Sequence, residues 1–215
     1  MKKTFWCALF SLSALVGCTV ESYESGDGEY SLLTAELVDA HTNANARVDY
    51  AETDGGERLT FAQPAEVKWM VVPDTTYRAA IYYKVVNGAS TLFSAGRVGI
   101  LSPHSISDMR TDPVGLESIW VAASKRYLNL SLNLMTGVVD DEKIHHTVSC
   151  RRDTLLTNPD GTRTLCLTLY HDQSQVPEYY TQRSFFSIPL QTGESDSIRF
   201  TVNTYNGKTV KTLAR

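Results

Sequence analysis

The residues best suited to acid–base or metal chemistry lie close together, between positions 140 and 146. Asp140, Asp141 and Glu142 precede the adjacent pair His145 and His146. Adjacent side chains on a strand point to opposite faces of a sheet, so the two histidines cannot easily bind one metal ion. The three carboxylates lack the alternating spacing of a calcium loop. We therefore interpret the acidic run as a solvated turn, His145 as a surface residue and His146 as a packed or hydrogen-bonded core residue, and we predict no metal site.

The sequence also lacks the motifs of common catalytic and phosphate-binding sites. It contains no Gly-x-Ser-x-Gly, no His-Glu-x-x-His, no Cys-x-x-Cys and no glycine-rich phosphate loop. The formal net charge of −4 argues against nucleic acid as a partner, because nucleic acid attracts basic surfaces. We predict a protein that is not an enzyme, needs no cofactor and does not bind nucleic acid.

Cys18 carries a reactive thiol and directly follows a short apolar run. Lys2 and Lys3 make the amino terminus positively charged, and the apolar run covers residues 5–16. That run is shorter than the ~20 residues of a membrane-spanning helix and suits a secretory signal. The ending Leu-Val-Gly-Cys resembles the bacterial lipobox, in which cleavage precedes the cysteine and the cysteine is acylated. We expect residues 1–17 to be a lipoprotein signal peptide and Cys18 to be lipidated. The alternative is an ordinary secretory signal with an incidental cysteine.

Lipidation would fix the location of the mature chain. Several acyl chains on one residue give stable anchoring, because each buried methylene contributes about 0.8 kcal/mol. Residues 18–29 are polar, acidic and contain glycine, which is typical of a flexible tether. We therefore expect a protein anchored by its lipid to the outer membrane, on either the periplasmic or the cell-surface face.

Cys150 and Cys166 remain in a compartment that permits disulfides, and they flank the turn sequence Asn-Pro-Asp-Gly at 158–161. A hairpin closed by this turn places Cys150 opposite Leu169 and Cys166 opposite Asp153. The two cysteines then point to opposite faces of the sheet. A disulfide between them is a candidate that requires a bulge or a different loop.

The pattern of short apolar segments bounded by turn residues predicts an all-β protein. Five strands over residues 30–101, with an Asp-Gly-Gly at 54–56 and an Asn-Gly at 87–88, predict a small OB-like barrel. The polar, proline-bounded segment 102–113 is predicted as a linker. Seven further strands over residues 114–215 predict an immunoglobulin-like β-sandwich. Among them, leucines at 128, 130, 132 and 134 alternate with Asn129, Ser131 and Asn133, which indicates a strand with one buried and one solvated face.

The loop at 172–182 contains the candidate partner-binding residues, Tyr179 and Tyr180. Both follow a proline in a polar loop at one end of the predicted sandwich. Tyrosine offers apolar area and a hydroxyl at low entropic cost, which suits contacts with protein or sugar. The alternative is that one tyrosine packs on the sandwich while the other is merely exposed.

The segments "DPVGLESIWVAASKRYLNLSLNL", "LTLYHD", "FFSIPL" and "FTVNTYNGKTVKTL" follow an order that resembles the NigD-like lipoproteins of Gram-negative bacteria. The resemblance implies an amino-terminal OB-type domain, a carboxy-terminal β-sandwich, a lipid anchor and an immunity role linked to a bacteriocin. We therefore expect a lipid-anchored envelope protein that binds a protein or peptide partner, for example by sequestering a secreted toxin. The alternative is a carbohydrate-binding surface lipoprotein.

Overall fold

The computed structural model describes residues 33–138 and 144–215, and Leu33–Arg215 forms one compact unit. The expected signal peptide, Cys18, the tether and the acidic run at 140–142 lie outside the described residues. Every regular element in the described part of the chain is a strand. None of these residues forms a helix with the length and apolarity needed to cross a membrane.

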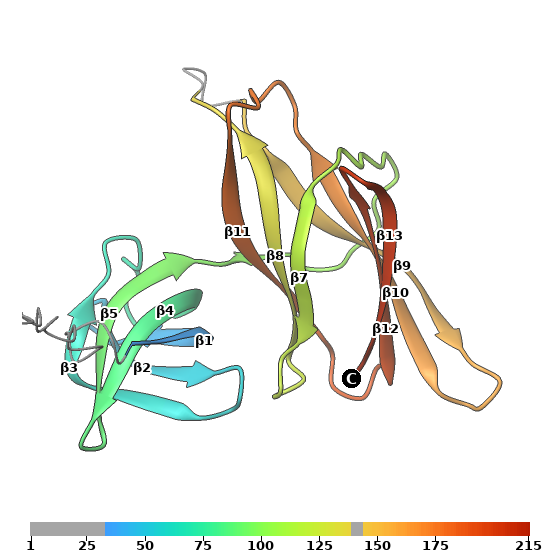
Figure 1. The fold of residues 1–215 in the computed structure, drawn as a ribbon. Coiled ribbons are helices and arrows are strands. Elements are labelled where there is room, and N and C mark those ends of the chain that lie inside the picture. Colours follow the sequence, from blue (N-terminus) through green and yellow to red (C-terminus); the bar gives the residue numbers. More distant parts are fainter. Residues whose placement is uncertain (1–32, 139–143) are drawn as a thin grey trace, which may run out of the picture. The chain divides into compact units, whose positions relative to one another are not determined.

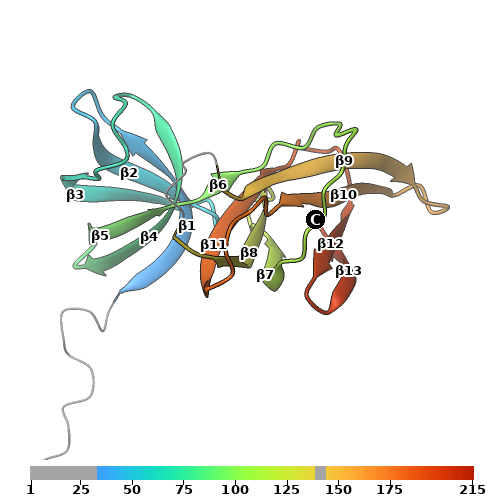
Figure 2. The ribbon, with the colours of Figure 1, turned by 90° about the horizontal axis from the view of Figure 1, so that it is seen from above.

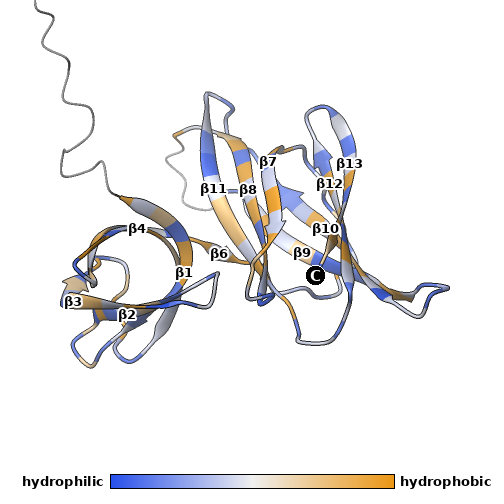
Figure 3. Ribbon diagram, turned by 60° about the horizontal axis from the view of Figure 1, so that its bottom comes forward, coloured by the Kyte–Doolittle hydropathy of each residue, from blue (hydrophilic) through white to orange (hydrophobic). Residues whose placement is uncertain are grey.

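The first five strands close into a barrel, in the order β1-β2-β3-β5-β4 (Figures 1 and 3). Neighbouring strands are antiparallel except β3 and β5, which meet in parallel through the pair Phe61 and Ser90. This is the small five-stranded barrel that the sequence predicts. The strands are β1 (Thr34–Thr42), β2 (Arg47–Thr53), β3 (Arg58–Glu66), β4 (Thr76–Val86) and β5 (Ala89–Arg97).

Turn residues and apolar alternation explain why these strands form where they do. Asn87 and Gly88 join β4 to β5 and both have positive φ, 51° and 79°. Such a primed turn matches the right-handed twist of the two strands, and Asn-Gly is its preferred sequence. Every second side chain points into the barrel and builds a small closed core, which includes Val38, Ala40, Val48, Phe61 and Ile81.

The remaining strands form two four-stranded sheets. One has the order β13-β12-β10-β9 and the other β6-β11-β8-β7 (Figures 1 and 2). Most neighbours are antiparallel, but β10 pairs with β12 and β6 pairs with β11 in parallel. The strands are β6 (Gly99–Ile100), β7 (Gly115–Val121), β8 (Tyr127–Thr136), β9 (Thr147–Thr157), β10 (Arg163–Asp172), β11 (Tyr180–Pro189), β12 (Ser197–Thr204) and β13 (Gly207–Ala214).

The two sheets share one apolar core. The four alternating leucines of β8 are all buried and face Leu165, Leu167 and Leu169 of β10 across the core, together with Cys150 and Phe200. Figure 3 shows the underlying alternation of apolar and polar residues along β8. The buried face of β8 is therefore the one that the leucine spacing predicts.

The segment between the barrel and β7 is paired with the sandwich rather than free. The amide of Leu101 donates to the carbonyl of Ser187 at 3.0 Å. Bridges then join His104 to Arg151, Thr111 to His171 and Val114 to Thr204. Residues 102–113, which the sequence predicts as a linker, thus run from the β11 sheet to the opposite sheet. These pairings give partners to backbone groups that would otherwise need water.

Candidate functional site

The polar face of β8 is buried at Asn129 and Ser131 and half-buried at Asn133, contrary to the sequence prediction that it is solvated. Asn129 has no exposed surface and Ser131 is 2% exposed. The prediction is wrong because it treats this face as a free surface, whereas barrel residues lie against it. The amide of Asn129 contacts Asp54 and Arg78 of the barrel, and Ser131 donates to Glu117 of β7 at 2.6 Å.

Arg78, on β4, is the centre of this contact. Its side chain is only 2% exposed. Nη2 donates to both carboxylate oxygens of Asp54, at 2.7 and 2.8 Å, and to Oδ1 of Asn129 at 3.2 Å. Nε donates to the hydroxyl of Ser187 at 3.0 Å, and Nη1 donates to Asp39 at 3.4 Å. One guanidinium therefore joins β1, the turn between β2 and β3, β8 and β11 to its own strand.

Asp39 extends the polar network towards the start of β8. It accepts from the hydroxyl of Tyr127 at 3.2 Å, and Nη1 of Arg126 lies 3.0 Å from its other carboxylate oxygen. The guanidinium of Arg78 also stacks over the Tyr127 ring at 4.1 Å. Burial, with the negative charge of Asp39, raises the pKa of Tyr127 and keeps its hydroxyl a hydrogen-bond donor. Buried ions that are paired and hydrogen-bonded in this way fix a single geometry between two elements.

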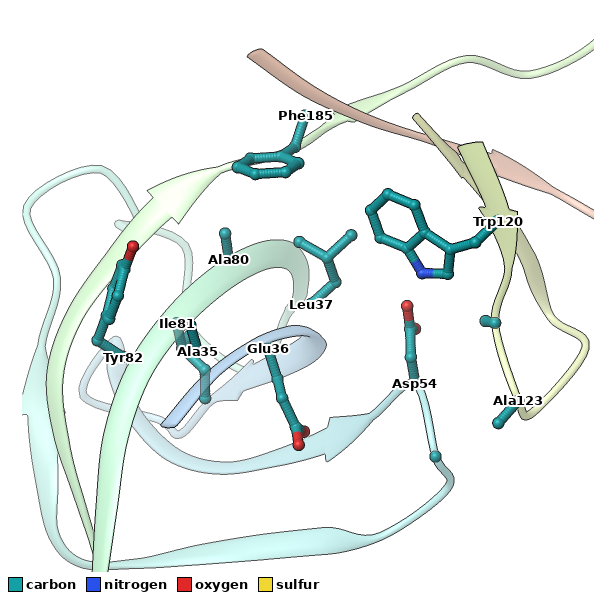
Figure 4. A pocket seen from close by; sticks show the side chains of 12 residues that line it. Ala35, Glu36, Leu37, Asp54, Ala80, Ile81, Tyr82, Trp120, Ala123 and Phe185 are labelled. Carbon is teal, nitrogen blue, oxygen red and sulfur yellow. The ribbon is translucent and has the colours of Figure 1, made fainter. Parts of the chain in front are cut away.

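A cavity of about 410 Å³ lies beside this network, between strands of the barrel and strands of the sandwich. Small and apolar side chains form its floor, including Leu37 and Ala80, which pair across β1 and β4. Aromatic rings stand around it from three separate strands: Tyr82 from β4, Trp120 from β7 and Phe185 from β11 (Figure 4).

Two acidic residues, Glu36 and Asp54, also border the cavity, but their carboxylates point in different directions. Glu36 pairs with the core residue Ile81 on the inner face of the barrel, so its carboxylate points away from the three rings (Figure 4). Asp54 is held by Arg78 and Asn129. Glu36 is absent from every ion pair found among the described residues. Burial and the nearby charge of Glu57 raise the pKa of Glu36, while a hydrogen bond from Tyr83 opposes that rise.

A second cavity, of about 780 Å³, shares Ala80, Tyr82 and Phe185 with the first. It adds Trp69 and Arg97, whose guanidinium lies 4.7 Å from the Trp69 ring centre. We call the two cavities together the interdomain groove. It is aromatic in the middle and basic beside Arg97, and it is the candidate functional site.

The tyrosines predicted from the sequence lie outside the residues that line this groove. Tyr179 is 79% exposed and Tyr180 is 52% exposed, so both side chains are accessible. The Tyr179 ring passes close over Gly137, where an added Cβ would lie 2.8 Å from the ring. Tyr180 begins β11 and pairs with Thr136.

The two cysteines are free thiols on opposite faces of one sheet. Cys150 pairs with Leu169, as predicted, and lies in the sandwich core, where burial raises its pKa to about 12. Cys166 pairs with Thr154 next to a register shift and is outside that core. The candidate disulfide is therefore not formed in the structure, because the alternation of a strand separates the two sulfurs.

The histidines form a pair that the sequence did not reveal. His146 is half-buried and its Nδ1 lies 3.0 Å from Nε2 of the buried His171. Nδ1 of His171 lies 3.0 Å from the carbonyl oxygen of Asp112 and donates to it. Its Nε2 is then the acceptor from His146. No group of three metal-binding side chains was found within the described part of the chain, and His145 is exposed.

The part of the chain that matches a known protein family is the sandwich. The sequence model of the NigD-like C-terminal β-sandwich domain matches residues 100–214, which is more than half of the chain. The chain belongs to the NigD-like family. The match begins at the end of β6, so it includes the segment at 102–113 that pairs with the sandwich.

Solved structures resemble the whole described unit of this NigD-like chain. A NigD-like immunity protein from Bacteroides caccae is 24% identical, with a TM-score of 0.63, over 84% of this chain and 91% of that one. A protein of unknown function from Bacteroides vulgatus is 16% identical, with a TM-score of 0.64, over 85% of this chain and 90% of that one. At these identities the likeness establishes the all-β fold. A search of curated proteins found no match.

Sequence reasoning missed the groove because its residues are scattered along the chain. Asp54 stands out in the sequence only as the start of a turn, and Arg78, Trp120 and Phe185 lie in strands with no chemical motif. One signal was available. A strand whose polar face consists of uncharged asparagine and serine, with no lysine or glutamate, is less polar than a solvated face usually is.

Proposed function

We propose that this NigD-like chain is a lipid-anchored envelope protein that binds a protein or peptide partner in the interdomain groove, without catalysis. The observation that carries the proposal is the groove itself. Three aromatic side chains from three strands converge on an apolar floor, and Arg78 holds the flanking strands in place. Aromatic residues in a preorganised concave site are the usual anchors of a binding partner.

The chemistry of the groove favours binding over turnover. Its acidic residues are Glu36, whose carboxylate points away from the three rings, and Asp54, whose two carboxylate oxygens are already engaged by Arg78. A hydrolytic site would need a nucleophile within hydrogen-bond reach of a base. The histidine pair of the sandwich is engaged with Asp112 and is not among the residues lining the groove.

Anchoring and location complete the proposal. Lipid on Cys18 would hold the folded body at the outer membrane through the acidic tether of residues 18–29, on the periplasmic or the surface face. The similarity to a protein described as an immunity protein supports a version in which the partner is a secreted toxin, captured before it reaches its target. Palmitate labelling of the mature chain, lost in Cys18→Ala, tests the anchor. An unlabelled wild-type protein would refute it.

Site-specific photocrosslinking in whole cells tests the groove. A photoreactive phenylalanine analogue at Tyr82, which is 50% exposed within the groove, is compared with the same analogue at Tyr205, which is 47% exposed elsewhere. We expect one partner to be captured from position 82 and not from 205, and Trp120→Ala to abolish that capture. Equal capture from both positions, or capture that survives Trp120→Ala, would contradict a groove-bound partner.

The second candidate function is carbohydrate binding through Tyr179 and Tyr180. It is favoured by their exposure, which would leave two rings free to stack on sugars. Affinity-gel electrophoresis on a panel of polysaccharides tests it. Retardation that disappears in Tyr179→Ala and Tyr180→Ala, but persists in Trp120→Ala, would favour this function over the groove.

A further inference from the structure

Strand β11 has a side along which most of its backbone is not paired with another strand (Figure 1). On one side it pairs with β8 along its whole length, but on the other side β6 pairs only with Phe186 and Ser187. The carbonyl of Ser187 accepts from the amide of Leu101 on that second side. Backbone direction alternates along a strand, so Thr181 and Arg183 direct their N–H and C=O groups to the same side as Ser187. Among the described residues, no strand pairs there with residues 181–184, which we call the free edge.

The other edge strands in the described part of the sandwich carry features that prevent further pairing. β13 contains Lys208 and Lys211, and lysine on an edge opposes the addition of a strand. β9 is covered at Arg151 by a bridge to His104, and β7 has a register shift beside Glu117. The free edge contains no lysine or proline, and β11 has no register shift against β8. It is therefore the edge of the sandwich best suited to accept another strand.

The free edge borders two cavities, one on each face of β11. Arg183 and Phe185 lie on the barrel side and line the cavity of about 780 Å³. Ser184 lies on the opposite face, as does Phe186, which packs against the sandwich core. These two residues also line a third cavity of about 400 Å³, together with Leu101, Leu134 and Val148. A strand added beside β11 would direct alternate side chains to the two faces, one towards each cavity.

The charge on the barrel side favours an acidic occupant. The lining of the 780 Å³ cavity includes Arg97 and Arg183 but no aspartate or glutamate. Arg183 pairs with Glu117, whereas Arg97 lies over the Trp69 ring and takes part in none of the ion pairs found among the described residues. Pairing of two β11 edges would bring two copies of Arg183 together, and like charges on neighbouring strands are destabilising. An acidic segment of another protein therefore fits this edge better than a second copy of the chain.

We infer that the free edge of β11 receives an extended segment of the partner as an added strand, with acidic side chains on the barrel side and apolar side chains on the sandwich side. This inference rests on the proposed function, because it names the binding mode of the partner at the groove. The backbone of the segment pairs with the N–H and C=O groups of Thr181 and Arg183, and pockets on the two faces select its side chains. The pairing of β6 with the same side of β11 shows that this edge has the geometry of a ladder.

The first test uses the full lipoprotein in detergent and the peptide acetyl-Val-Glu-Val-Glu-Val-amide, titrated by calorimetry. Two further peptides carry backbone N-methyl groups, one at the glutamates and the other at the valines. Only one edge of an added strand faces β11, so we expect one N-methylated peptide to bind about tenfold more weakly and the other to bind like the parent peptide. Acetyl-Val-Lys-Val-Lys-Val-amide, the charge control, should also bind about tenfold more weakly than the parent.

The second test changes the edge itself. The N–H of Arg183 faces the free edge, so Arg183→Pro removes that donor without removing a hydrogen bond to β8. Arg183→Gln is the matched variant, because it removes the same charge and keeps the N–H. We expect Arg183→Pro to abolish binding of the glutamate peptide and Arg183→Gln to weaken it about threefold. Circular dichroism and the melting temperature check that both variants fold, and the N-methylated peptides test the wild-type protein independently of them.

Four outcomes would overturn the inference. They are no binding of the glutamate peptide, equal affinity for the parent and both N-methylated peptides, unchanged affinity in Arg183→Pro, and a dimer in sedimentation that Arg183→Pro dissociates. The last outcome would assign the edge to a second copy of the chain. The partner captured from position 82 separates failure of this inference from failure of the proposed function. If capture is lost in Trp120→Ala but unchanged in Arg183→Pro, the groove binds a partner without strand addition.

Discussion

Replacement of Arg78 by methionine tests whether the polar network couples the barrel to the sandwich. Methionine fills similar space but removes every hydrogen bond that the guanidinium makes to Asp39, Asp54, Asn129 and Ser187. Removing one partner of a buried ion pair costs about 3–5 kcal/mol, because the other charge stays buried without compensation.

The structure places the expected cost at the lower end of that range. Asp39 keeps Arg126 at 3.0 Å and the Tyr127 hydroxyl at 3.2 Å, so its charge stays matched. Asp54 keeps only the amide of Asn129, at 2.6 Å, but its side chain is 16% exposed and reaches some water. We therefore expect Arg78→Met to lower the free energy of unfolding by about 3 kcal/mol, a large part of the ~5–15 kcal/mol typical of a folded protein.

Urea unfolding followed by tryptophan fluorescence measures this loss. We expect the midpoint to fall by about 1 M, given an m-value of ~2–3 kcal/mol/M. Trp69 reports on the barrel and Trp120 on the sandwich. If Arg78→Met uncouples the barrel from the sandwich, the fluorescence should therefore change in two separate unfolding steps. In Arg47→Met, the control, a surface pair with Glu66 at 3.5 Å is lost and the expected change is within ~1 kcal/mol.

A double variant tests whether the unmatched charge of Asp54 causes the loss of stability in Arg78→Met. Arg78→Met with Asp54→Asn leaves a neutral amide in place of the unmatched carboxylate, and we expect it to recover about 1–2 kcal/mol of the loss. The reasoning is refuted if Arg78→Met is as stable as Arg47→Met, or if the double variant is less stable than Arg78→Met alone.

Three further predictions follow from the sandwich. Burial and the adjacent His171 lower the pKa of His146 below 6.5, so the unfolded chain binds the proton more readily. The free energy of unfolding should therefore fall as pH drops below about 6.5 and should fall less in His146→Gln, and equal pH slopes in urea titrations would refute this. A Cβ at Gly99 would lie 2.5 Å from the Phe186 ring, so Gly99→Ala should lower the free energy of unfolding by about 1–3 kcal/mol, and an unchanged melting temperature would contradict the clash. With a pKa of about 12 and a core position, the Cys150 thiol should react with Ellman's reagent only after unfolding, and rapid labelling of the native protein, checked by mass spectrometry, would be inconsistent with its burial.

Much of the fold could be predicted because its determinants are local. The Asn-Gly at 87–88 gives a hairpin wherever it joins two alternating strands, and the chain forms one there. The leucines of β8 select their buried face by spacing alone. The register across the turn at 158–161 is also correct at Cys150, but it shifts near Cys166, where a bulge that no sequence signal marks changes the pairing.

The candidate site was not predictable in the same way. Arg78 is one arginine in a strand, and its hydrogen bond to Ser187 spans 109 positions in the sequence. Trp120 and Phe185 lie in separate strands of the sandwich, and Leu37 lies in the barrel. Nothing in the spacing of these residues marks them as neighbours, because two folded bodies must meet before they share a cavity.

The sequence by itself determined the all-β character, the positions of the hairpins and the faces that build each core, since period-two alternation and turn chemistry act over a few residues. Only the tertiary structure decided which polar side chains are buried and which groups they pair with. It buried Asn129 on a face that looked solvated, enclosed Arg78 among two carboxylates and brought Trp120 and Phe185 to one cavity. The physical reason is that charge pairing and cavities depend on distances through space, which local patterns do not specify.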